Sequence, residues 1–226
     1  MASKSLKLLF ALIFLFSFTG LQAQEADRER LDMLNINLNS TFLLGSQGSF
    51  EQKFYSHGYD LHFMYDHPMP RSPISIGIGI GLSHQRVYSN AAVVWTDSNS
   101  TIWHTFRTEA IDTTIRRSAF NMNYYEIPAE IRYRTKPDER GHPWKIAVGA
   151  KIGFKLNSKQ LLVDDNGHRF TTTAFPHTAR IRGVGTFRVG YGKISLYGAY
   201  QFTTLFHEGQ GDELYPFSAG VTLSLF

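Results

Sequence analysis

The chain has 226 residues, of which 42% are hydrophobic and 19% are charged, a composition typical of one ordered domain and not of a disordered tail. It contains no cysteine, which excludes disulfide scaffolds, thiolate metal sites, a cysteine nucleophile and a lipid anchor on an N-terminal cysteine. Two of the 23 basic residues lie in the first 23 positions, so 21 face 19 acidic ones beyond them, and this near balance indicates no nucleic-acid partner.

Residues 1–23 have the order of a secretory signal peptide. Two lysines precede an apolar run, and a small residue, Ala23, closes the segment. Cleavage after Ala23 is expected to leave a short periplasmic segment, residues 24–33, ahead of the main domain, residues 34–226. No later run reaches about 18 apolar residues, which excludes a membrane protein built from several helices.

Beyond residue 33, apolar and polar residues alternate, and a period of two is typical of strands with one apolar face. In the cleanest segment, isoleucine or leucine occupies every even position from 74 to 82, while only serine or glycine occupies the odd ones. Eight segments are predicted as strands: about 34–44, 59–65, 74–82, 125–134, 144–156, 181–191, 196–203 and 217–225.

The connections between these segments alternate in length. Short links lie near residues 67–73, 135–143 and 190–193. Longer ones span about residues 46–56, 90–118, 158–177 and 207–215. An even number of strands with short turns at one end and long loops at the other predicts an all-β fold, an eight-stranded antiparallel up-and-down transmembrane β-barrel of the outer membrane. Strands of about 11 residues, tilted by roughly 40°, would stand about 27 Å tall, which matches the apolar band of such barrels.

Aromatic residues recur near both ends of the predicted strands, on or beside the apolar face. At the short-turn end they are Tyr65, Tyr133, Trp144, Tyr191 and Phe226. At the long-loop end they are Phe42, Tyr59, Tyr125, Phe154, Phe202 and Phe217. Two such girdles are typical of transmembrane barrels. A soluble β-sandwich or a lipocalin-like barrel also alternates, but it buries its apolar faces and leaves the charged faces and the girdles unexplained.

The stretch Tyr124-Tyr125-Glu126-Ile127-Pro128 resembles the Tyr-x-Glu-Ile-Pro strand of the PorT-like outer-membrane β-barrel domain, a family widespread in Bacteroidetes. The segments Arg188–Gly192, Gly209–Gly211 and Pro216–Gly220 resemble later parts of the same family, so the resemblance covers roughly residues 34–226. The last strand also resembles the C-terminal signal that barrel-assembly machineries read. The resemblance implies an outer-membrane location and a barrel architecture. The expected partners are outer-membrane lipid and lipopolysaccharide, and the barrel-assembly machinery through the C-terminal strand.

Charged residues of the predicted strands fall on the inward face. Because an eight-stranded barrel is filled by its own side chains, these charges are expected to pair with one another and plug the interior. The candidate network consists of Asp60, Glu126, Glu130, Arg132, Lys151 and Arg188. The alternative is a small gated pore or a barrel that binds an anionic ligand or lipopolysaccharide. In that case Lys155, Arg180 and Arg182 near the long-loop mouth are the candidate contacts.

No catalytic or metal-binding motif is found. The histidines show no pair at ligand spacing, so no metal and no other cofactor is expected. The glycines at 77, 79 and 81 lie within a strand and are interpreted as space for bulky neighbours, not as a phosphate loop. The adjacent pairs Ser56–His57 and Ser83–His84 point to opposite faces, so neither forms a dyad. We therefore expect no enzyme, and a lipid-modifying one is the weakest alternative.

The long loops contain two predicted hairpins, which are expected to extend the barrel wall; the alternative is a surface that binds a partner. One carries Trp95 and Trp103 on its two arms, and these tryptophans are candidates for binding a protein partner outside the membrane. The other turns at Asp165-Asn166-Gly167, where the Asn-Gly pair favours a type I′ turn.

Overall fold

The computed structural model describes residues 32–45, 52–96, 100–105, 115–173, 178–207 and 213–225, and the predicted signal peptide lies outside them. No helix in these ranges is long and apolar enough to cross a membrane. The described strands are β1 (Leu34–Leu44), β2 (His57–Pro68), β3 (Ile74–Ser89), β4 (Ala91–Thr96), β5 (Ser100–Thr105), β6 (Ile115–Arg134), β7 (Trp144–Asp164), β8 (Arg169–Thr173), β9 (Ile181–Tyr191), β10 (Ile194–Gln201) and β11 (Tyr215–Leu225).

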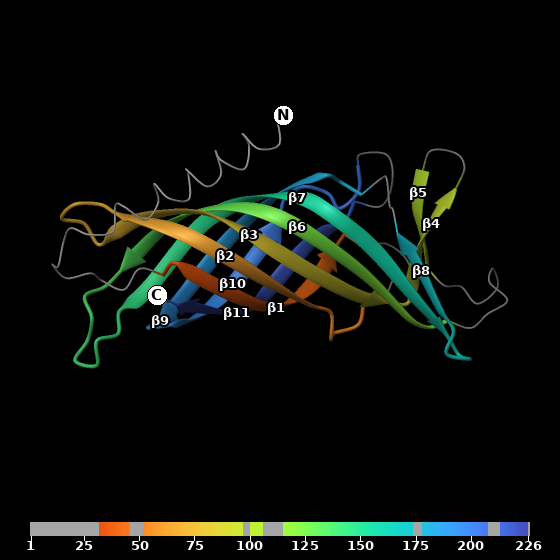
Figure 1. The fold of residues 1–226 in the computed structure, drawn as a ribbon, viewed down its shortest axis with the longest axis horizontal. Helices are drawn as coiled ribbons and strands as arrows, with labels where there is room; N and C mark the ends of the chain where they lie inside the picture. The colour runs from red at the N-terminus through yellow and green to blue at the C-terminus, as the bar shows by residue number, and fades with distance from the viewer. Residues whose placement is uncertain are drawn as a thin grey trace, which may run out of the picture. The chain divides into compact units, whose positions relative to one another are not determined.

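Eight of these strands close into a ring. Their order is β1-β2-β3-β6-β7-β9-β10-β11, and β11 pairs with β1 from Leu34 opposite Leu225 to Leu44 opposite Tyr215 (Figure 1). Every pair in the ring is antiparallel, and each strand lies beside the next one along the chain. The predicted eight-stranded up-and-down barrel is therefore confirmed. Strand β8 pairs only with β7, and β4 pairs with β5 in a separate sheet.

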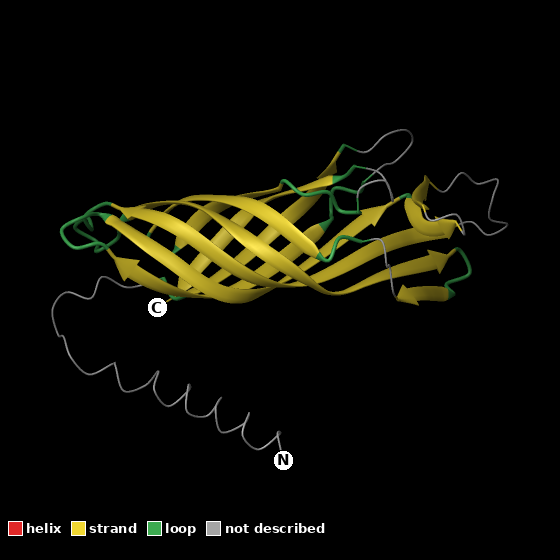
Figure 2. Ribbon diagram, turned by 90° about the horizontal axis from the view of Figure 1, so that it is seen from above, coloured by secondary structure: helices red, strands yellow, loops and turns green. Residues whose placement is uncertain are grey.

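Three strands are longer than the alternation predicts. Strands β3, β6 and β7 have 16, 20 and 21 residues, while β1, β9 and β11 each have 11. In Figure 1, β6 and β7 run past the end of β1 on the side of the long connections. The long connections at residues 90–118 and 158–177 were expected to contain hairpins that extend the wall, and strand pairing does continue into both ranges. The wall therefore extends beyond the other strand ends (Figure 2).

Both predicted hairpins are present in the backbone. In the first, β4 and β5 pair with Val93 opposite Trp103. In the second, four residues join β7 to β8, with the chain reversing over residues 165–167 between Asp164 and His168, whose backbones are hydrogen-bonded, but the prediction of a type I′ turn is wrong. That turn needs a positive φ at two successive positions, and here Gly167 has φ +85° while Asn166 is not among the positive-φ residues. The backbone N–H of Gly167 donates to the carbonyl of Asp164, and its left-handed conformation completes a three-residue loop.

The barrel wall has the opposite polarity to that of a water-soluble protein over most of its height. Large apolar side chains face outward and are exposed, with Ile78 at 55%, Leu196 at 65% and Val148 at 56%. The buried side chains that alternate with them are mostly polar or charged, including Asn37 and Glu126. A soluble sandwich or lipocalin would bury the apolar set instead, so this arrangement excludes both alternatives.

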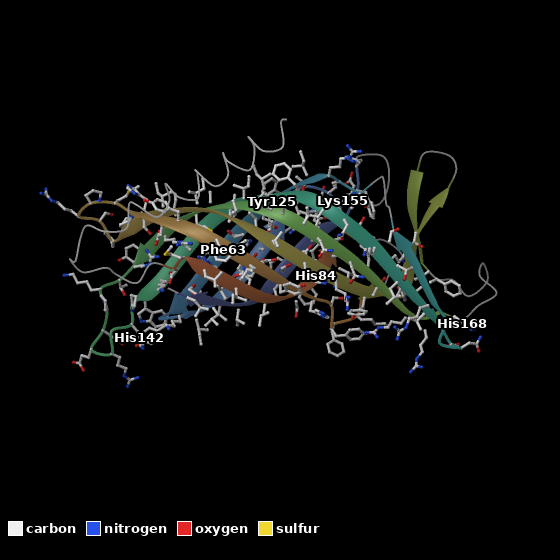
Figure 3. The ribbon with its side chains drawn as sticks, in the orientation of Figure 1. Phe63, His84, Tyr125, His142, Lys155 and His168 are labelled. Atoms are coloured by element: carbon white, nitrogen blue, oxygen red, sulfur yellow. The ribbon has the colours of Figure 1, made fainter. Side chains whose placement is uncertain are left out.

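The expected aromatic girdles lie on this outer wall. At the short-turn end Tyr65, Tyr133 and Trp144 are exposed, and Tyr191 is half-buried; Phe226 lies outside the described residues. At the other end Phe42, Tyr59, Phe154 and Phe202 are exposed, and Tyr125 and Phe217 are half-buried. His142, in a short turn, and His168, in the β7–β8 connection, are labelled at opposite ends of the barrel in Figure 3.

The polarity of the wall reverses along β6 while the inward–outward alternation of β6 itself continues, although its pairing with β7 shifts by one residue between Asn123 and Tyr124. Outward positions are apolar up to Tyr125 and then become Asn123 and Asn121. Inward positions run from Glu126 to Tyr124 and then to other buried apolar residues. When a strand leaves a membrane and enters water, its outward face must change from apolar to polar, and its inward face can become apolar. The boundary of the apolar band on β6 therefore lies between Tyr125 and Asn123.

Strand β3 reverses at the same level. Its outward positions change from Leu82 to His84, and Leu82 lies opposite Tyr125 while His84 lies opposite Asn123. Its inward positions change from Gln85 to the buried Val87. Figure 3 labels His84 and Tyr125 on these neighbouring strands. The agreement between two strands that are far apart in sequence defines one edge of the lipid-facing surface.

On the long-loop side of this edge, called above it from here on, the barrel encloses a small apolar core, here called the apolar cap. Inward side chains of β1, β3 and β6 contribute to it, together with three residues from the segment between β10 and β11. That segment is held by backbone hydrogen bonds from Leu205 N to Leu214 O at 2.9 Å and from Ala179 N to Leu205 O at 2.9 Å. The members of the apolar cap are Leu43, Val87, Phe120, Met122, Tyr124, Leu205, Phe206 and Leu214.

The short turn between β6 and β7 is ordered by one carboxylate. Asp138 Oδ1 accepts hydrogen bonds from the backbone N–H groups of Arg140 and His142, each at 2.9 Å. The hydroxyl of Tyr191 donates to the other oxygen of Asp138. This hydrogen bond from Tyr191, followed by the one from the His142 backbone, holds the pKa of the Asp138 carboxyl below its usual range. The proline and glycine of this turn were thus read correctly as a chain reversal.

Candidate functional site

A cluster of charged side chains lies inside the barrel at mid-height, here called the central cluster: Asp60, His62, Glu126, Lys151 and Arg182. The ammonium of Lys151 lies 3.1 Å from Asp60 Oδ2 and 2.9 Å from Glu126 Oε2. A guanidinium nitrogen of Arg182 lies 2.5 Å from Glu126 Oε1. The four charged side chains are almost fully buried. Two carboxylates therefore face two cations.

Neutral side chains add further hydrogen bonds to the Asp60 carboxylate of the central cluster. The hydroxyl of Ser83 donates to Asp60 Oδ1 at 2.6 Å, and the amide of Asn37 donates to Asp60 Oδ2 at 3.2 Å. Both contacts follow from the register, because Asn37 and Ser83 lie directly opposite Asp60 on the neighbouring strands. The hydroxyl of Tyr197 also donates to Asp60, at 3.3 Å. Every carboxylate oxygen in the central cluster thus has a partner, which is what makes buried charges tolerable.

Two glycines make room for this arrangement around Glu126. Gly81 and Gly153 lie opposite Glu126 on its two neighbouring strands. A Cβ at Gly81 would lie 2.2 Å from the ring of His62, and a Cβ at Gly153 would lie 2.8 Å from the Arg182 side chain. The interpretation of the glycine row of β3 as space for bulky neighbours is thus supported at Gly81. His62 uses this space to place Nε2 2.8 Å from Glu126.

The same cluster contains the group of potential metal ligands found among the described residues. Ligand atoms of Asp60, His62 and Glu126 lie within 4.8 Å of one another, a donor set that suits a divalent cation. However, the Lys151 ammonium already bridges the two carboxylates. A metal ion would have to displace this buried cation, so the residues present are satisfied without one. Sequence reasoning missed the group because residues 60 and 62 lie on β2 and residue 126 lies on β6.

A second charged cluster, here called the lower cluster, lies toward the short-turn end. Glu130 Oε2 accepts from Arg132 Nε at 3.0 Å and from Arg188 Nη2 at 2.5 Å. Arg188 also donates to Asn35 Oδ1 at 3.1 Å. Glu130 lies opposite Gly77 on β3, and a Cβ at Gly77 would lie 2.9 Å from the Arg132 guanidinium carbon.

The lower cluster is extended by Asp32, which precedes the first strand. Its Oδ1 lies 2.5 Å from the Lys145 ammonium, and its Oδ2 lies 3.2 Å from Arg134. Arg134 also pairs with Asp66, which in turn lies 3.4 Å from Arg132. Within the predicted short periplasmic segment, residues 24–33, Asp32 is buried among these ion pairs. Asp32 precedes the first alternating segment, so no periodic pattern predicts that its side chain lies inside the barrel.

Little open space remains between these side chains. One cavity beside the central cluster, lined by Asp60, Lys151 and Arg182, has about 10 Å³ accessible to the centre of a water molecule. A second, lined by Asp32 and Arg134 of the lower cluster, is of the same size. A cavity needs about 10–15 Å³ of space accessible to the centre of a water molecule in order to hold one water molecule. Neither cavity can hold a larger ligand without rearrangement.

The six residues predicted as an interior charge network are all inside the barrel. The structure brings them together in two groups: Asp60, Glu126 and Lys151 in the central cluster, and Glu130, Arg132 and Arg188 in the lower cluster. Six of their partners were not predicted as members of the interior charge network: Arg182, His62, Asp66, Arg134, Asp32 and Lys145.

The three residues predicted to contact an anion at the mouth do not converge. Arg182 is 1% exposed, stacks over the ring of Tyr124 at 3.6 Å and pairs with Glu126, so the structure places it in the central cluster and not at the mouth. The physical reason is the space at Gly153, which lets its side chain reach down into the barrel. Lys155 Nζ donates to the backbone carbonyl of Thr178 at 2.9 Å, while Arg180 is exposed.

The two candidate tryptophans of the loops lie on β5 and β4. Trp103 is opposite Val93 in the backbone register, and Trp95 is opposite Thr101. Their side chains lie outside what the structure describes.

Comparison with known proteins agrees with this architecture. The chain matches the model of the outer membrane protein beta-barrel domain over residues 22–224. No curated protein sequence matches it. With the outward apolar wall, the two girdles and the polar interior, this match establishes that the chain belongs to the outer membrane protein beta-barrel domain family and is an integral barrel of the outer membrane.

Proposed function

We propose that this protein is a sealed, non-conducting and non-enzymatic barrel of the PorT-like kind found in Bacteroidetes, with a structural or interaction role in the outer membrane. Residues 1–23 act as a cleaved signal peptide, and the barrel-assembly machinery reads β11. The short turns face the periplasm and the long loops face outward, where an unidentified protein partner binds. The PorT-like assignment is supported by the Tyr-x-Glu-Ile-Pro resemblance at residues 124–128.

The observation that carries the proposal is the succession of occupied levels inside the barrel. From the short-turn end these are the lower cluster, the central cluster and the apolar cap. An open aqueous channel would have to break ion pairs at two levels and displace apolar side chains at the third. Removing one partner of a buried ion pair costs roughly 3–5 kcal/mol, which disfavours spontaneous opening.

The structure also suggests a physical role for the glutamate of the Tyr-x-Glu-Ile-Pro strand. Glu126 is contacted by Lys151 from β7, Arg182 from β9 and His62 from β2. One carboxylate therefore joins four strands of the ring across its interior. This supports a structural interpretation of the motif and not a catalytic one.

Planar-bilayer conductance of the purified, refolded protein tests the proposal. Heat-modifiable gel mobility first establishes that the barrel has folded. We expect no unitary conductance steps from the wild type and none from Phe206→Ser, because the two charged levels remain closed when the apolar cap is weakened. Stable steps from the wild type would contradict the sealed interior and favour the small gated pore. Steps from Phe206→Ser alone would contradict the claim that the two charged levels are closed, since they would place the whole barrier in the apolar cap.

A further inference from the structure

A row of polar side chains crosses the outer wall directly above the apolar band. His84 lies opposite Asn123, and Asn123 lies opposite Asn157, on β3, β6 and β7. His84 Nδ1 is 2.7 Å from Asn123 Oδ1, and the amide of Asn123 donates to Asn157 Oδ1 at 2.5 Å. On β2, Tyr59 stacks against the ring of His84 at 4.9 Å. These contacts fix the row across four neighbouring strands.

A second row, one step higher on the same wall, carries cations. Arg86 lies opposite Asn121, and Asn121 lies opposite Lys159. Arg86 Nε donates to Asn121 Oδ1, and its Nη1 lies 3.5 Å from the hydroxyl of Tyr88. Asn121 in turn donates to the backbone carbonyl of Lys159 at 3.4 Å. The Arg86 guanidinium is thus held on the wall with further N–H groups left for a ligand, and the side chain of Lys159 is exposed.

The height of these two rows places the cations beside lipid headgroups. The last apolar row consists of Leu61, Leu82, Tyr125 and Phe154, which lie opposite one another on β2, β3, β6 and β7. The cationic row lies four residues further along β3 and β6, and five residues further along β7, whose pairing with β6 shifts by one residue between the two rows. At about 3.4 Å per residue and a tilt of roughly 40°, it stands about 10 Å above the apolar row.

Charge and spacing indicate the chemistry of the ligand. The two rows contain no acidic residue among those that the structure describes. Arg86 and Lys159 are separated by one strand, so their backbones lie roughly 10 Å apart. Arginine and lysine donate charge-assisted hydrogen bonds to phosphate. A molecule that satisfies both this row and the apolar wall below must carry phosphate on a headgroup and acyl chains beneath it.

We propose that Arg86 and Lys159 bind the phosphorylated headgroup of an outer-leaflet glycolipid, whose acyl chains pack along the wall around Leu82. The site is a lipid site on the outside of the barrel, separate from Lys155 and Arg180 at the mouth. It rests on the proposed orientation, with the long loops outward, and is independent of whether the interior is sealed.

Native mass spectrometry of the detergent-solubilised protein, titrated with diphosphorylated lipid A, tests this site. Loss of one headgroup cation near a membrane surface is worth about 5-fold in affinity, so Arg86→Gln/Lys159→Gln is expected to bind roughly 20-fold more weakly. The matched control, Lys136→Gln/Arg140→Gln, removes the same charge from an exposed short turn and is expected to bind like the wild type. Monophosphorylated lipid A is expected to bind more weakly than the diphosphorylated form.

Three results would overturn the lipid site: equal binding by Arg86→Gln/Lys159→Gln and the wild type, equal losses in the control, or displacement of lipid A by millimolar inorganic phosphate. The last would indicate a site for a soluble anion. The orientation is tested separately by labelling Phe54→Cys on intact cells with a membrane-impermeant maleimide, because Phe54 is 84% exposed at the long-loop end. Absence of labelling would show that the orientation, and with it the outer-leaflet assignment, is wrong. Conductance of the wild type reports on the sealed interior without affecting this site.

Discussion

Replacing Lys151 by methionine is expected to lower the free energy of unfolding by about 3–5 kcal/mol. The ammonium bridges Asp60 and Glu126 in the central cluster, and its loss leaves two buried carboxylates with only Arg182 as a charged partner. Methionine keeps most of the side-chain volume, so the effect reports on charge and not on a cavity. Urea unfolding of the refolded protein, followed by gel mobility, measures the difference.

A double variant distinguishes the effect of an unbalanced buried charge on stability from the effect of disrupted packing inside the barrel. Asp60→Asn combined with Lys151→Met removes one charge of each sign and leaves Glu126 paired with Arg182. We expect the double variant to be more stable than the sum of the two single effects by at least about 1 kcal/mol. Additive effects would mean that Asp60 and Lys151 do not interact, contrary to the 3.1 Å ion pair.

Replacing Ile78 by arginine is expected to cost roughly 2–4 kcal/mol and to impair membrane insertion. Ile78 is the middle member of five outward apolar positions on β3, so an arginine there lies near the centre of the lipid-facing band. Unfolding in lipid vesicles gives the free energy, and the heat-modifiable fraction gives the extent of insertion.

The matched control for Ile78→Arg is Asn157→Arg, which is also outward and exposed but lies above the apolar band. Because the cost of a lipid-facing arginine falls toward the interface, we expect about 0–1 kcal/mol there. Because Ser83 lies on the inward face of β3, an arginine there would be expected to cost less than at Ile78. However, Ser83 is buried and hydrogen-bonded to Asp60 and Arg182, so it does not serve as a control. Similar costs at Ile78 and Asn157 would contradict the assigned edge of the band.

The strands and their faces were predictable because a period of two leaves a direct trace in sequence. The extensions of β3 and β6 were not predicted, since the apolar residues change parity there. On β6 the apolar set runs over even positions to Tyr124 and over odd positions from Tyr125 onward. When the two segments are treated as one continuous strand, the change of parity marks the place where the wall leaves the membrane. The strand was predicted to begin near Tyr125 and the long connection to end near residue 118, so residues 119–124 were assigned to neither.

The interior residues were predictable as a set, but their pairing was not. Which cation meets which carboxylate depends on the stagger of the strands when the ring closes, and no local pattern carries that information. Arg182 illustrates this, since it was predicted to contact a ligand at the mouth, whereas the space at Gly153 lets its side chain pair with Glu126 in the central cluster. Asp32 lies before the first alternating segment, so only the folded structure brings it to Arg134 and Lys145.

The change from apolar to polar outward residues between Leu82 and His84 is the feature on which the other assignments depend. It defines the edge of the lipid-facing band, and the apolar cap and the proposed lipid site are both placed relative to that edge. Spin labels on single cysteines at positions 78, 80, 82, 84 and 86 test it directly, and the absence of native cysteine keeps the labelling specific. In lipid vesicles, collisions with oxygen should dominate at positions 78, 80 and 82, and collisions with a water-soluble nickel complex should dominate at 84 and 86. Oxygen-dominated labels at positions 84 and 86 would show that the lipid-facing band continues upward and would contradict the account.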